Sequence, residues 1–354
     1  MEETIILTTQ KQLLVLVLAL AACFHCCAAE PLRVLQFNVW QEGTSVENGL
    51  EKICDVIIAS KAQIVCFSEV RNYKNIDWTT RVVEALEKKN QTFYGKFGGG
   101  DVGLVSTFPI QETKVVYNAT KGDSGSIVAW QLKRPTGERL IVASAHLDYK
   151  HYGLNLIRGY NGGDPDWKIR EADANGNPVP VTDTAAVLAY NNRSKRVEAI
   201  QSFIKIALEW EKQKLPVILC GDFNEGSHLD WTALAKNEFG HNGVVIEWPC
   251  TQLLAQAGFA DAWRAVHVDE VKQPGFTWPA PVPGKKTTSW ANKSDERDRI
   301  DFVFAKGLKA TGAWVVGPKK TLCRDEPTPD PDADLILLDG LPWPSDHKAV
   351  LIQF

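Results

Sequence analysis

The chain has 354 residues, of which 44% are hydrophobic and 23% charged, a composition typical of folded globular proteins. Its formal net charge of −4 at pH 7 and its pI near 6.0 exclude a uniformly basic surface of the kind that binds nucleic acid, although they leave local patches open. No internal repeat or linker divides the sequence after its N-terminus. We therefore expect one large domain over residues 30–354.

The N-terminus has the pattern of a secretory signal peptide. Lys11 precedes an apolar run at residues 13–24, and the small residues Ala28 and Ala29 follow it. The run is shorter than the about 20 residues that a membrane-spanning helix needs. We therefore predict that residues 1–29 are a cleaved leader and that the mature protein is secreted; the alternative is an uncleaved anchor.

The N-glycosylation sequons and the cysteines bear on the prediction of export. The sequence contains eight cysteines, three of them inside the leader. Cys66 and Cys220 lie in apolar runs typical of buried thiols. Cys250 and Cys323 lie in polar, loop-like sequence, so we predict a disulfide between them. The predicted N-glycosylation sequons begin at Asn90, Asn118, Asn192 and Asn292.

Strand and helix patterns alternate along the rest of the chain. In chain order we predict a strand at 31–38, a helix at 45–60, a strand at 62–69, a helix at 77–89, strands at 94–97, 102–107, 126–133 and 139–146, a helix at 192–214, and strands at 215–224, 297–307 and 346–354. Residues 150–192 are rich in Gly, Asn, Asp and Pro, which predicts an irregular insertion. The order of elements predicts an α/β fold with mixed sheets.

The predicted strands share one feature, which is a polar side chain at or beside one end. Such groups line a crevice when the strands lie side by side in an α/β sheet. Half of them are carboxylates, and the rest are two amides and two histidines with no cysteine, a set that suits Mg²⁺ or Mn²⁺ better than zinc. The residues are Asn38, Glu69, His146, Asp222, Asn224, Asp301, Asp346 and His347.

Six short motifs that contain these residues resemble the motifs of a known family. They are FNVW (37–40), SEV (68–70), SAHLD (144–148), GDFNE (221–225), RIDFVF (299–304) and SDHKAV (345–350). In this order they resemble the motifs of the endonuclease/exonuclease/phosphatase (DNase I-like) superfamily, over about residues 31–354. The group includes pancreatic deoxyribonuclease, abasic-site endonucleases, inositol-polyphosphate 5-phosphatases and neutral sphingomyelinases.

The resemblance implies a four-layer α/β sandwich, in which two mixed β-sheets pack face to face with flanking helices. It also implies hydrolysis of a phosphoester with a divalent cation. Carried over to this chain, it makes Glu69 the principal metal ligand, helped by Asn38 and Asp346. Asp222 would orient or deprotonate the attacking water, and Asn224 would hold that water or a phosphate oxygen.

The resemblance implies roles for two histidines as well. His347, positioned by Asp301, would contact the scissile phosphate, and His146 would donate to another of its oxygens. These residue types suit the chemistry, because the negative charge of a phosphodiester repels a nucleophile. A site therefore needs a cation, fixed donors and a base within reach of water.

Candidate substrate-binding residues adjoin these motifs. Asp148 and Tyr149 follow the His146 motif directly and are predicted to face the substrate. Phe276 and Trp278 are predicted to form an aromatic wall beside the phosphate. The insertion at 150–192 follows a strand end of the site, so we expect it to overhang the crevice.

We therefore predict a secreted, Mg²⁺- or Mn²⁺-dependent phosphoesterase that acts on a phosphomonoester or phosphodiester of a small, lipid-linked or sugar-linked substrate. A secreted endonuclease or exonuclease is the first alternative, disfavoured by the acidic pI and the lack of a Lys/Arg run. A non-catalytic secreted binding protein on the same scaffold is a second. A glycoside hydrolase with a carboxylate pair is a third, and it would leave the Asn and His positions unexplained.

Overall fold

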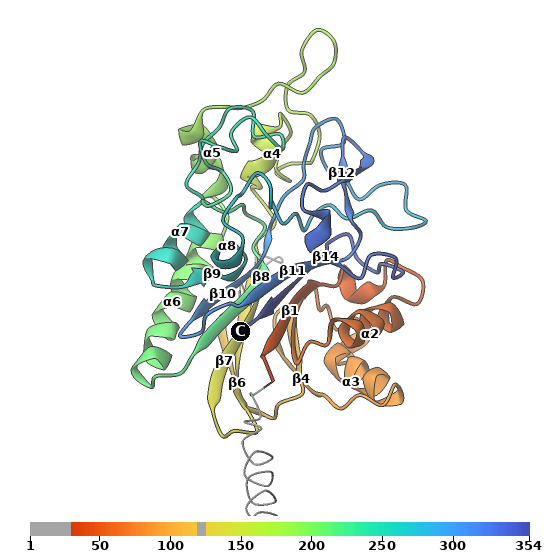
Figure 1. Ribbon diagram of the computed structural model, residues 1–354. Coiled ribbons are helices and arrows are strands. Elements are labelled where there is room, and N and C mark those ends of the chain that lie inside the picture. Colours follow the sequence, from red (N-terminus) through yellow and green to blue (C-terminus); the bar gives the residue numbers. More distant parts are fainter. Residues whose placement is uncertain (1–29, 119–124) are drawn as a thin grey trace, which may run out of the picture. The chain divides into compact units, whose positions relative to one another are not determined.

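Two β-sheets form the centre of the protein in a computed structural model that describes residues 30–118 and 125–354 (Figure 1). The first sheet contains, in spatial order, β14 (Ile336–Leu337), β11 (Gly312–Val316), β15 (Ala349–Gln353), β1 (Arg33–Asn38), β2 (Ile64–Ser68), β4 (Val102–Ser106) and β3 (Tyr94–Gly99). The second contains β5 (Ile110–Asn118), β6 (Gly125–Lys133), β7 (Arg139–Leu147), β8 (Val217–Asp222), β10 (Asp301–Lys306) and β9 (Ala260–Asp261). Both are mixed, since β1 is parallel to β2 but antiparallel to β15, and β8 is parallel to β7 but antiparallel to β10.

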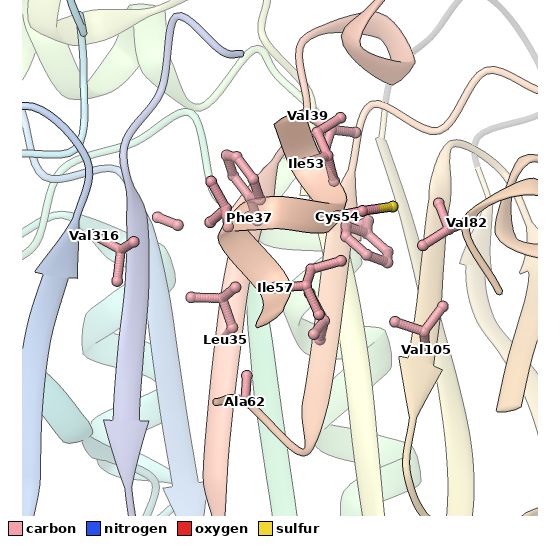
Figure 2. Packing of buried hydrophobic residues seen from close by; sticks show 14 of the residues in the cluster. Leu35, Phe37, Val39, Ile53, Cys54, Ile57, Ala62, Val82, Val105 and Val316 are labelled. Atoms are coloured by element: carbon pink, nitrogen blue, oxygen red, sulfur yellow. The ribbon is translucent and has the colours of Figure 1, made fainter. Parts of the chain in front are cut away.

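Helices cover the outer face of each sheet, as Figure 1 shows. Ile53 and Ile57 lie one helical turn apart and pack beside Leu35 and Phe37 of β1 in a buried cluster (Figure 2). The predicted arrangement of two mixed sheets with flanking helices is confirmed. The first sheet carries α2 (Gly49–Ser60) and α3 (Trp78–Lys88), and the second carries α6 (Arg196–Lys212) and α7 (Pro249–Gln256).

The inner faces of the two sheets meet through small polar side chains. Ser68 of β2 donates a hydrogen bond of 3.0 Å to the Ala145 carbonyl of β7, and Ser144 of β7 donates one of 2.9 Å to the Phe67 carbonyl of β2. Side chains of this size let the two backbones approach closely and satisfy their own buried hydroxyls. The strand ends of both sheets are thereby brought close enough to share one site.

Residues 150–192 are irregular between 158 and 183 and helical on either side of that stretch. They contain the short helices α4 (Gly153–Ile157) and α5 (Thr184–Asn191). Tyr152 and Ile157 are buried in a cluster with Trp248 and Trp278, which come from distant parts of the sequence. Helices this short are stabilised mainly by tertiary packing, so the local sequence does not reveal them.

The sequence pattern also missed several strands, β5 and β11 among them, and it placed the start of a helix too early. β5 is an edge strand whose residues are mostly exposed and polar, so it lacks the apolar alternation of its neighbours. β11 is a five-residue run, too short to be distinguished from other buried segments. The helix predicted at 45–60 begins at Gly49, after Asn48 in the left-handed conformation.

The predicted disulfide between Cys250 and Cys323 is wrong. Each of the five cysteines in the described part of the chain is a free, buried thiol. Cys250 lies in α7, whereas Cys323 ends β12 (Lys320–Cys323), a strand that pairs with β13 (Glu326–Pro329) in a separate hairpin.

The predicted leader, residues 1–29, lies outside the described residues. Within residues 30–118 and 125–354, no helix is both long enough and apolar enough to cross a bilayer. The four sequon asparagines are exposed.

Candidate active site

Three polar side chains form a row across the second sheet. The register of β7 and β8 places His146 beside Asp222, and the register of β8 and β10 places Asp222 beside Asp301. Residues paired across neighbouring strands point to the same face of a sheet. The row lies where β7 and β8 end and β10 begins, so the strand-end residues of this sheet form one cluster.

The first sheet contributes Asn38 and Glu69 to the same cluster. The amide nitrogen of Asn38 donates to Asp222 Oδ2 at 2.9 Å and to Glu69 Oε1 at 3.3 Å. Glu69 directly follows β2 and has a φ of 65°, which is uncommon for a residue other than glycine. Its Oε2 accepts a hydrogen bond of 2.9 Å from the backbone N–H of Gln41. This bond and the unusual backbone conformation hold the carboxylate at the edge of the sheet.

Asp222 lies between two histidines, each of which is held by a second carboxylate. The Nε2 atoms of His146 and His347 are 3.8 Å and 3.7 Å from Asp222 Oδ2. On the far side of each ring, His146 Nδ1 donates to Asp101 Oδ2, and His347 Nδ1 donates to Asp301 Oδ2 at 2.8 Å. Because Nδ1 is engaged by a carboxylate, Nε2 is the nitrogen directed at Asp222.

Electrostatic interactions keep both imidazoles charged at neutral pH. Burial disfavours a charged ring, but Asp101 and Asp222 outweigh it and raise the pKa of His146 to about 10. In the same way, Asp301 and Asp222 raise the pKa of His347 to about 10. Burial raises the pKa of Asp222 to about 6, with the two imidazoles opposing the shift. At pH 7 the site therefore holds a carboxylate between two cations.

Asp101 is a site residue that the sequence analysis did not identify. It lies in the turn between β3 and β4, where no strand end or motif marks it. Its carboxylate accepts hydrogen bonds from Ser126 Oγ at 2.6 Å and from Arg71 Nη1 at 3.2 Å, in addition to His146. The charges of His146 and Arg71 outweigh burial and lower the pKa of Asp101. The run of glycines before it indicates a turn but not a functional residue.

A cleft of about 440 Å³ opens over these side chains. Asn38 and Asp301 lie buried behind its lining. The cleft is lined by Trp40, Gln41, Glu69, Arg71, His146, Tyr149, Asp222, Asn224, Thr287, Thr288, Ser289, Trp290, Asp346 and His347. The predicted catalytic residues and the carboxylates predicted as metal ligands thus converge on one cavity.

Comparison with known proteins identifies the family. The model of the Endonuclease/Exonuclease/phosphatase family matches residues 35–347. The chain belongs to this family. F14F9.5, an uncharacterized protein of Caenorhabditis elegans, is 28% identical over 283 residues, which cover 78% of this chain and 79% of that protein.

Solved structures share the fold. D. rerio TDP2 complexed with single strand DNA product has a TM-score of 0.52 and 14% identity, over 92% of this chain and 98% of that chain. Truncated Caenorhabditis elegans TDP2 also has a TM-score of 0.52 and 14% identity, over 92% of this chain and 97% of that chain. At this level of identity the likeness establishes the fold alone. Endonuclease/exonuclease/phosphatase enzymes are hydrolytic phosphoesterases and nucleases that use a divalent metal ion.

The carboxylates of the cleft fit the cation that this family uses. Burial, together with the charges of Glu69 and Asp222, raises the pKa of Asp346 to about 7 despite the nearby His347. Among the described residues, Asp346 Oδ1 is buried with no hydrogen-bond partner. A bound cation would relieve both the crowded negative charge and the unpaired oxygen, and carboxylate oxygens suit Mg²⁺ or Mn²⁺. Glu69 and Asp346 are the residues that would hold it.

The other potential metal ligands at the site already interact with neighbouring protein groups. Asp222, Asp301 and His347 have ligating atoms within 4.8 Å of one another, but a protonated His347 has no lone pair to give a metal. We interpret these three residues as a hydrogen-bonded charge cluster. Asn38, a predicted ligand, presents its nitrogen to the carboxylates, while its Oδ1 accepts from the backbone N–H of Trp40 at 3.0 Å. In this structure Asn38 acts as a donor between carboxylates.

Of the predicted site residues that follow β7 and β8, two line the cleft and one is buried outside it. Tyr149 lines the cleft, as predicted for a substrate-binding residue. Asp148 is buried outside it, and its Oδ2 accepts from the backbone N–H of Lys195 at 3.0 Å, which ties it to the start of α6. Asn224 lines the cleft, and its amide nitrogen donates one of its two hydrogens to the Leu147 carbonyl at 3.1 Å.

The aromatic wall of the cleft consists of residues other than those predicted. Phe276 packs against Phe239 outside the cleft, and Trp278 is buried with its ring 4.8 Å from that of Trp290. Trp40 and Trp290 reach the cleft instead. Among the described cleft-lining residues none comes from 150–192, so this segment supports the wall from behind and does not overhang the crevice as expected.

The segment that carries Trp290 is held by one buried carboxylate. Glu296 is 1% exposed. Its Oε2 accepts from the backbone N–H groups of Trp290 at 3.1 Å and Ala291 at 2.8 Å, and its Oε1 accepts from Ser289 Oγ. Burial outweighs these bonds and raises the pKa of Glu296 to about 7.

Substitution of Glu296 by Gln is expected to change how stability depends on pH. Because the folded-state pKa of about 7 lies above the ordinary value of 4.5, this group stabilises the fold most below pH 4.5 and loses that contribution as the pH rises through 7. Gln keeps the same shape without the titration. The unfolding free energy of Glu296→Gln relative to wild type should therefore be higher at pH 8 than at pH 5, by about 2 kcal/mol. Chemical denaturation at both pH values measures it.

The exposed Glu84 of α3 provides the control. Glu84→Gln should show the same difference from wild type at pH 5 and at pH 8. An equally flat result for Glu296→Gln would contradict the assignment of a raised pKa to Glu296.

Proposed function

We propose that the protein is a divalent-metal-dependent hydrolase of small phosphoesters. The observation that carries this proposal is the position of Asp222 Oδ2, 3.8 Å and 3.7 Å from the Nε2 atoms of His146 and His347. Hydrolysis of a negatively charged ester needs fixed cationic donors together with a base. This arrangement supplies both at the base of the cleft.

In the proposed reaction, side chains of this protein stabilise the charge of the phosphate and transfer the protons. The Nε2–H groups of His146 and His347 are too far from Asp222 for a direct hydrogen bond, so they are available to donate to the non-bridging oxygens of a phosphate. Asp222 accepts a proton from the attacking water, whose oxygen bonds to phosphorus as the bond to the alcohol oxygen breaks. As that bond breaks, the alcohol oxygen takes the Nε2 proton of one imidazolium, which then no longer donates to a non-bridging oxygen, and the proton held by Asp222 afterwards recharges that ring. Asp101 and Asp301 hold the two rings in place.

The metal requirement rests on the carboxylates opposite the histidines. Glu69 and Asp346 would hold the cation, which when bound offsets negative charge on the phosphate. The unpaired Asp346 Oδ1 and the raised pKa of Asp346 support this assignment.

Removal of divalent cations is expected to lower the hydrolysis rate at least about 100-fold, and Mg²⁺ or Mn²⁺ should restore it. The cation should also stabilise the fold, because it binds the native site: at about 100 times its Kd it adds about 2.7 kcal/mol to the unfolding free energy. Glu69→Gln should lose most of this stabilisation. Phosphoester hydrolysis and thermal unfolding, each with chelator and with added Mg²⁺, measure both effects.

The exposed carboxylate Asp334, in the short helix η3 (Ala333–Leu335), gives a matched control. Asp334→Asn should retain both the rate and the stabilisation by Mg²⁺. The metal proposal fails if chelator changes neither the rate nor the unfolding temperature of the wild-type protein.

For the substrate, we propose a small lipid-linked or sugar-linked phosphoester. Among the described residues that line the cleft, Arg71 is the sole Lys or Arg, and it is paired with Asp101 at 3.2 Å and lies 4.0 Å from Glu69. Tracking a nucleic-acid backbone usually requires several basic side chains. The composition of the cleft therefore supports a single phosphoester group over a polyanion.

A substrate screen distinguishes the alternatives. Phosphoinositide, sphingomyelin, plasmid and single-stranded DNA are incubated with the protein, with and without chelator, and phosphoester cleavage is measured. Cleavage of a lipid or sugar phosphoester supports the proposal, and preferential cleavage of either DNA would identify a nuclease instead. Absence of any cleavage, with ligand binding intact, would indicate a binding protein on this scaffold.

We further propose that the protein is exported and N-glycosylated. The apolar run at 13–24, the small residues after it and the four exposed sequon asparagines support this. Expression of the full chain in secreting eukaryotic cells should release a protein that begins near residue 30 and loses mass on deglycosylation. Retention of the intact N-terminus in the cell fraction would overturn the proposal.

A further inference from the structure

Apart from its charged residues and amides, the cleft is lined by rings and hydroxyls. Trp40, Tyr149 and Trp290 are half-buried at its surface. Thr287 and Ser289 adjoin Trp290 on the same segment. No aliphatic side chain occurs among the described cleft-lining residues. Because an acyl chain binds mainly to aliphatic side chains, this surface is unsuited to one.

The Trp290 ring packs against two other aromatic rings. Its ring centroid lies 4.2 Å from that of Trp167 and 4.8 Å from that of Trp278. The Trp167 ring also lies against Tyr149, with centroids 6.5 Å apart and planes inclined by 30°. Packing of this kind fixes the orientation of Trp290 while part of its ring remains exposed to the cleft.

The backbone at Trp290 is fixed as well. Glu296 accepts the N–H groups of Trp290 and Ala291 and the hydroxyl of Ser289, and Thr288 Oγ1 donates to the Ala280 carbonyl at 2.8 Å. These bonds hold three consecutive cleft residues without any contact between Glu296 and the cleft itself. Glu296 can therefore affect a ligand only through the residues it holds, Trp290 and Ser289.

We propose that Trp290 is a specificity-determining residue that stacks against a polyhydroxylated six-membered ring, a cyclitol or hexose, esterified to the phosphate, and that Glu296 is the residue that positions it. The inference rests on the proposed phosphoesterase function. The C–H face of such a ring packs on an indole, while its hydroxyls find partners in Thr287, Ser289 and Gln41, which line the same cleft. An uncharged ring needs no basic side chains beyond those that bind the phosphate.

The test compares two diesters that share glycerol phosphate and differ in the second alcohol. Glycerophosphoinositol carries the ring, and glycerophosphoethanolamine does not. In Trp290→Ala, KM for glycerophosphoinositol should rise about tenfold with little change in kcat, which lowers the ratio of kcat/KM for the two substrates by a similar factor. Trp290→Phe should retain most of the preference, because it keeps an aromatic face.

Glu296 variants test positioning separately from contact. Glu296→Ala should raise KM for glycerophosphoinositol as Trp290→Ala does. Glu296→Gln should behave like wild type, because its oxygen can accept the two backbone N–H groups and its NH₂ can donate to Ser289 Oγ. Tyr94→Ala, which removes an exposed ring on β3 outside this cleft, is the control and should leave the ratio unchanged.

The outcomes separate this inference from the proposed function. Cleavage of neither diester, nor of any other phosphoester, overturns the function and the inference together. Cleavage with an unchanged ratio in Trp290→Ala and Glu296→Ala overturns the inference alone. If Trp290→Ala loses more kcat/KM for a dinucleoside monophosphate than for glycerophosphoinositol, the ring that Trp290 binds is a nucleobase. That result would also overturn the inference.

Discussion

Substitution of Asp222 by Asn is expected to lower kcat by about three orders of magnitude, because the amide cannot accept a proton from water. The fold should be unaffected or slightly more stable, since burial raises the pKa of Asp222 to about 6 and its charge is therefore unfavourable in the folded protein. The single oxygen of Asn can keep one of the two hydrogen bonds that Asp222 accepts, from Asn38 or from the backbone N–H of Asn224. Steady-state kinetics on the best phosphoester substrate, with chemical denaturation of the same preparation, measures both effects.

Asp334→Asn serves again as the control, because it makes the same chemical change at an exposed position. It should leave kcat and stability within experimental error of wild type. Retention of more than about a tenth of the wild-type kcat in Asp222→Asn would show that another group accepts the proton.

The second large effect is expected at His347 and its partner. His347→Ala should lower kcat by about two to three orders of magnitude, since a cationic donor at the phosphate is lost. Asp301→Asn should lower kcat by a smaller factor, because Asp301 acts through the ring whose Nδ1 lies 2.8 Å from its carboxylate. The double variant should be no slower than His347→Ala alone, because its two changes affect one unit.

The same single and double substitutions at Asp101 and His146 allow the two aspartate–histidine pairs to be compared. The same non-additivity is expected there, because His146 Nδ1 donates to Asp101. Fully additive losses in either pair would mean that the carboxylate has a role of its own, and the interpretation of that aspartate as a positioning residue would be withdrawn.

Strand-end residues were predictable from sequence because the signal is local. Asn38, Glu69, His146 and Asp222 each follow an apolar run that must be buried, so their positions at one edge follow from the sheet itself. The partners of these residues were not predictable in the same way. Asp101 lies in a turn and reaches His146 across 45 residues, and only the packing of β3 and β4 against β6 and β7 brings the two together.

The aromatic wall shows why composition could not locate the substrate side. Trp278 and Trp290 lie twelve positions apart in similar loop sequence, yet one is buried and the other lines the cleft. Glu296 holds the backbone of Trp290, whose ring packs at 4.8 Å against the buried ring of Trp278. Such a distinction depends on contacts between segments, which hydrophobicity and spacing do not encode.

The sequence by itself determined the fold class, the family and the ends of the strands that carry the reaction, since burial and alternation are local properties of the chain. The tertiary structure decided which groups pair, which carboxylates crowd together and which rings are reachable. Asp101 holds His146, Asp346 keeps an unpaired oxygen beside Glu69, and residues 150–192 support Trp290 from behind. Charge and stacking act over a few ångströms between residues far apart in the chain, so only the folded arrangement specifies them.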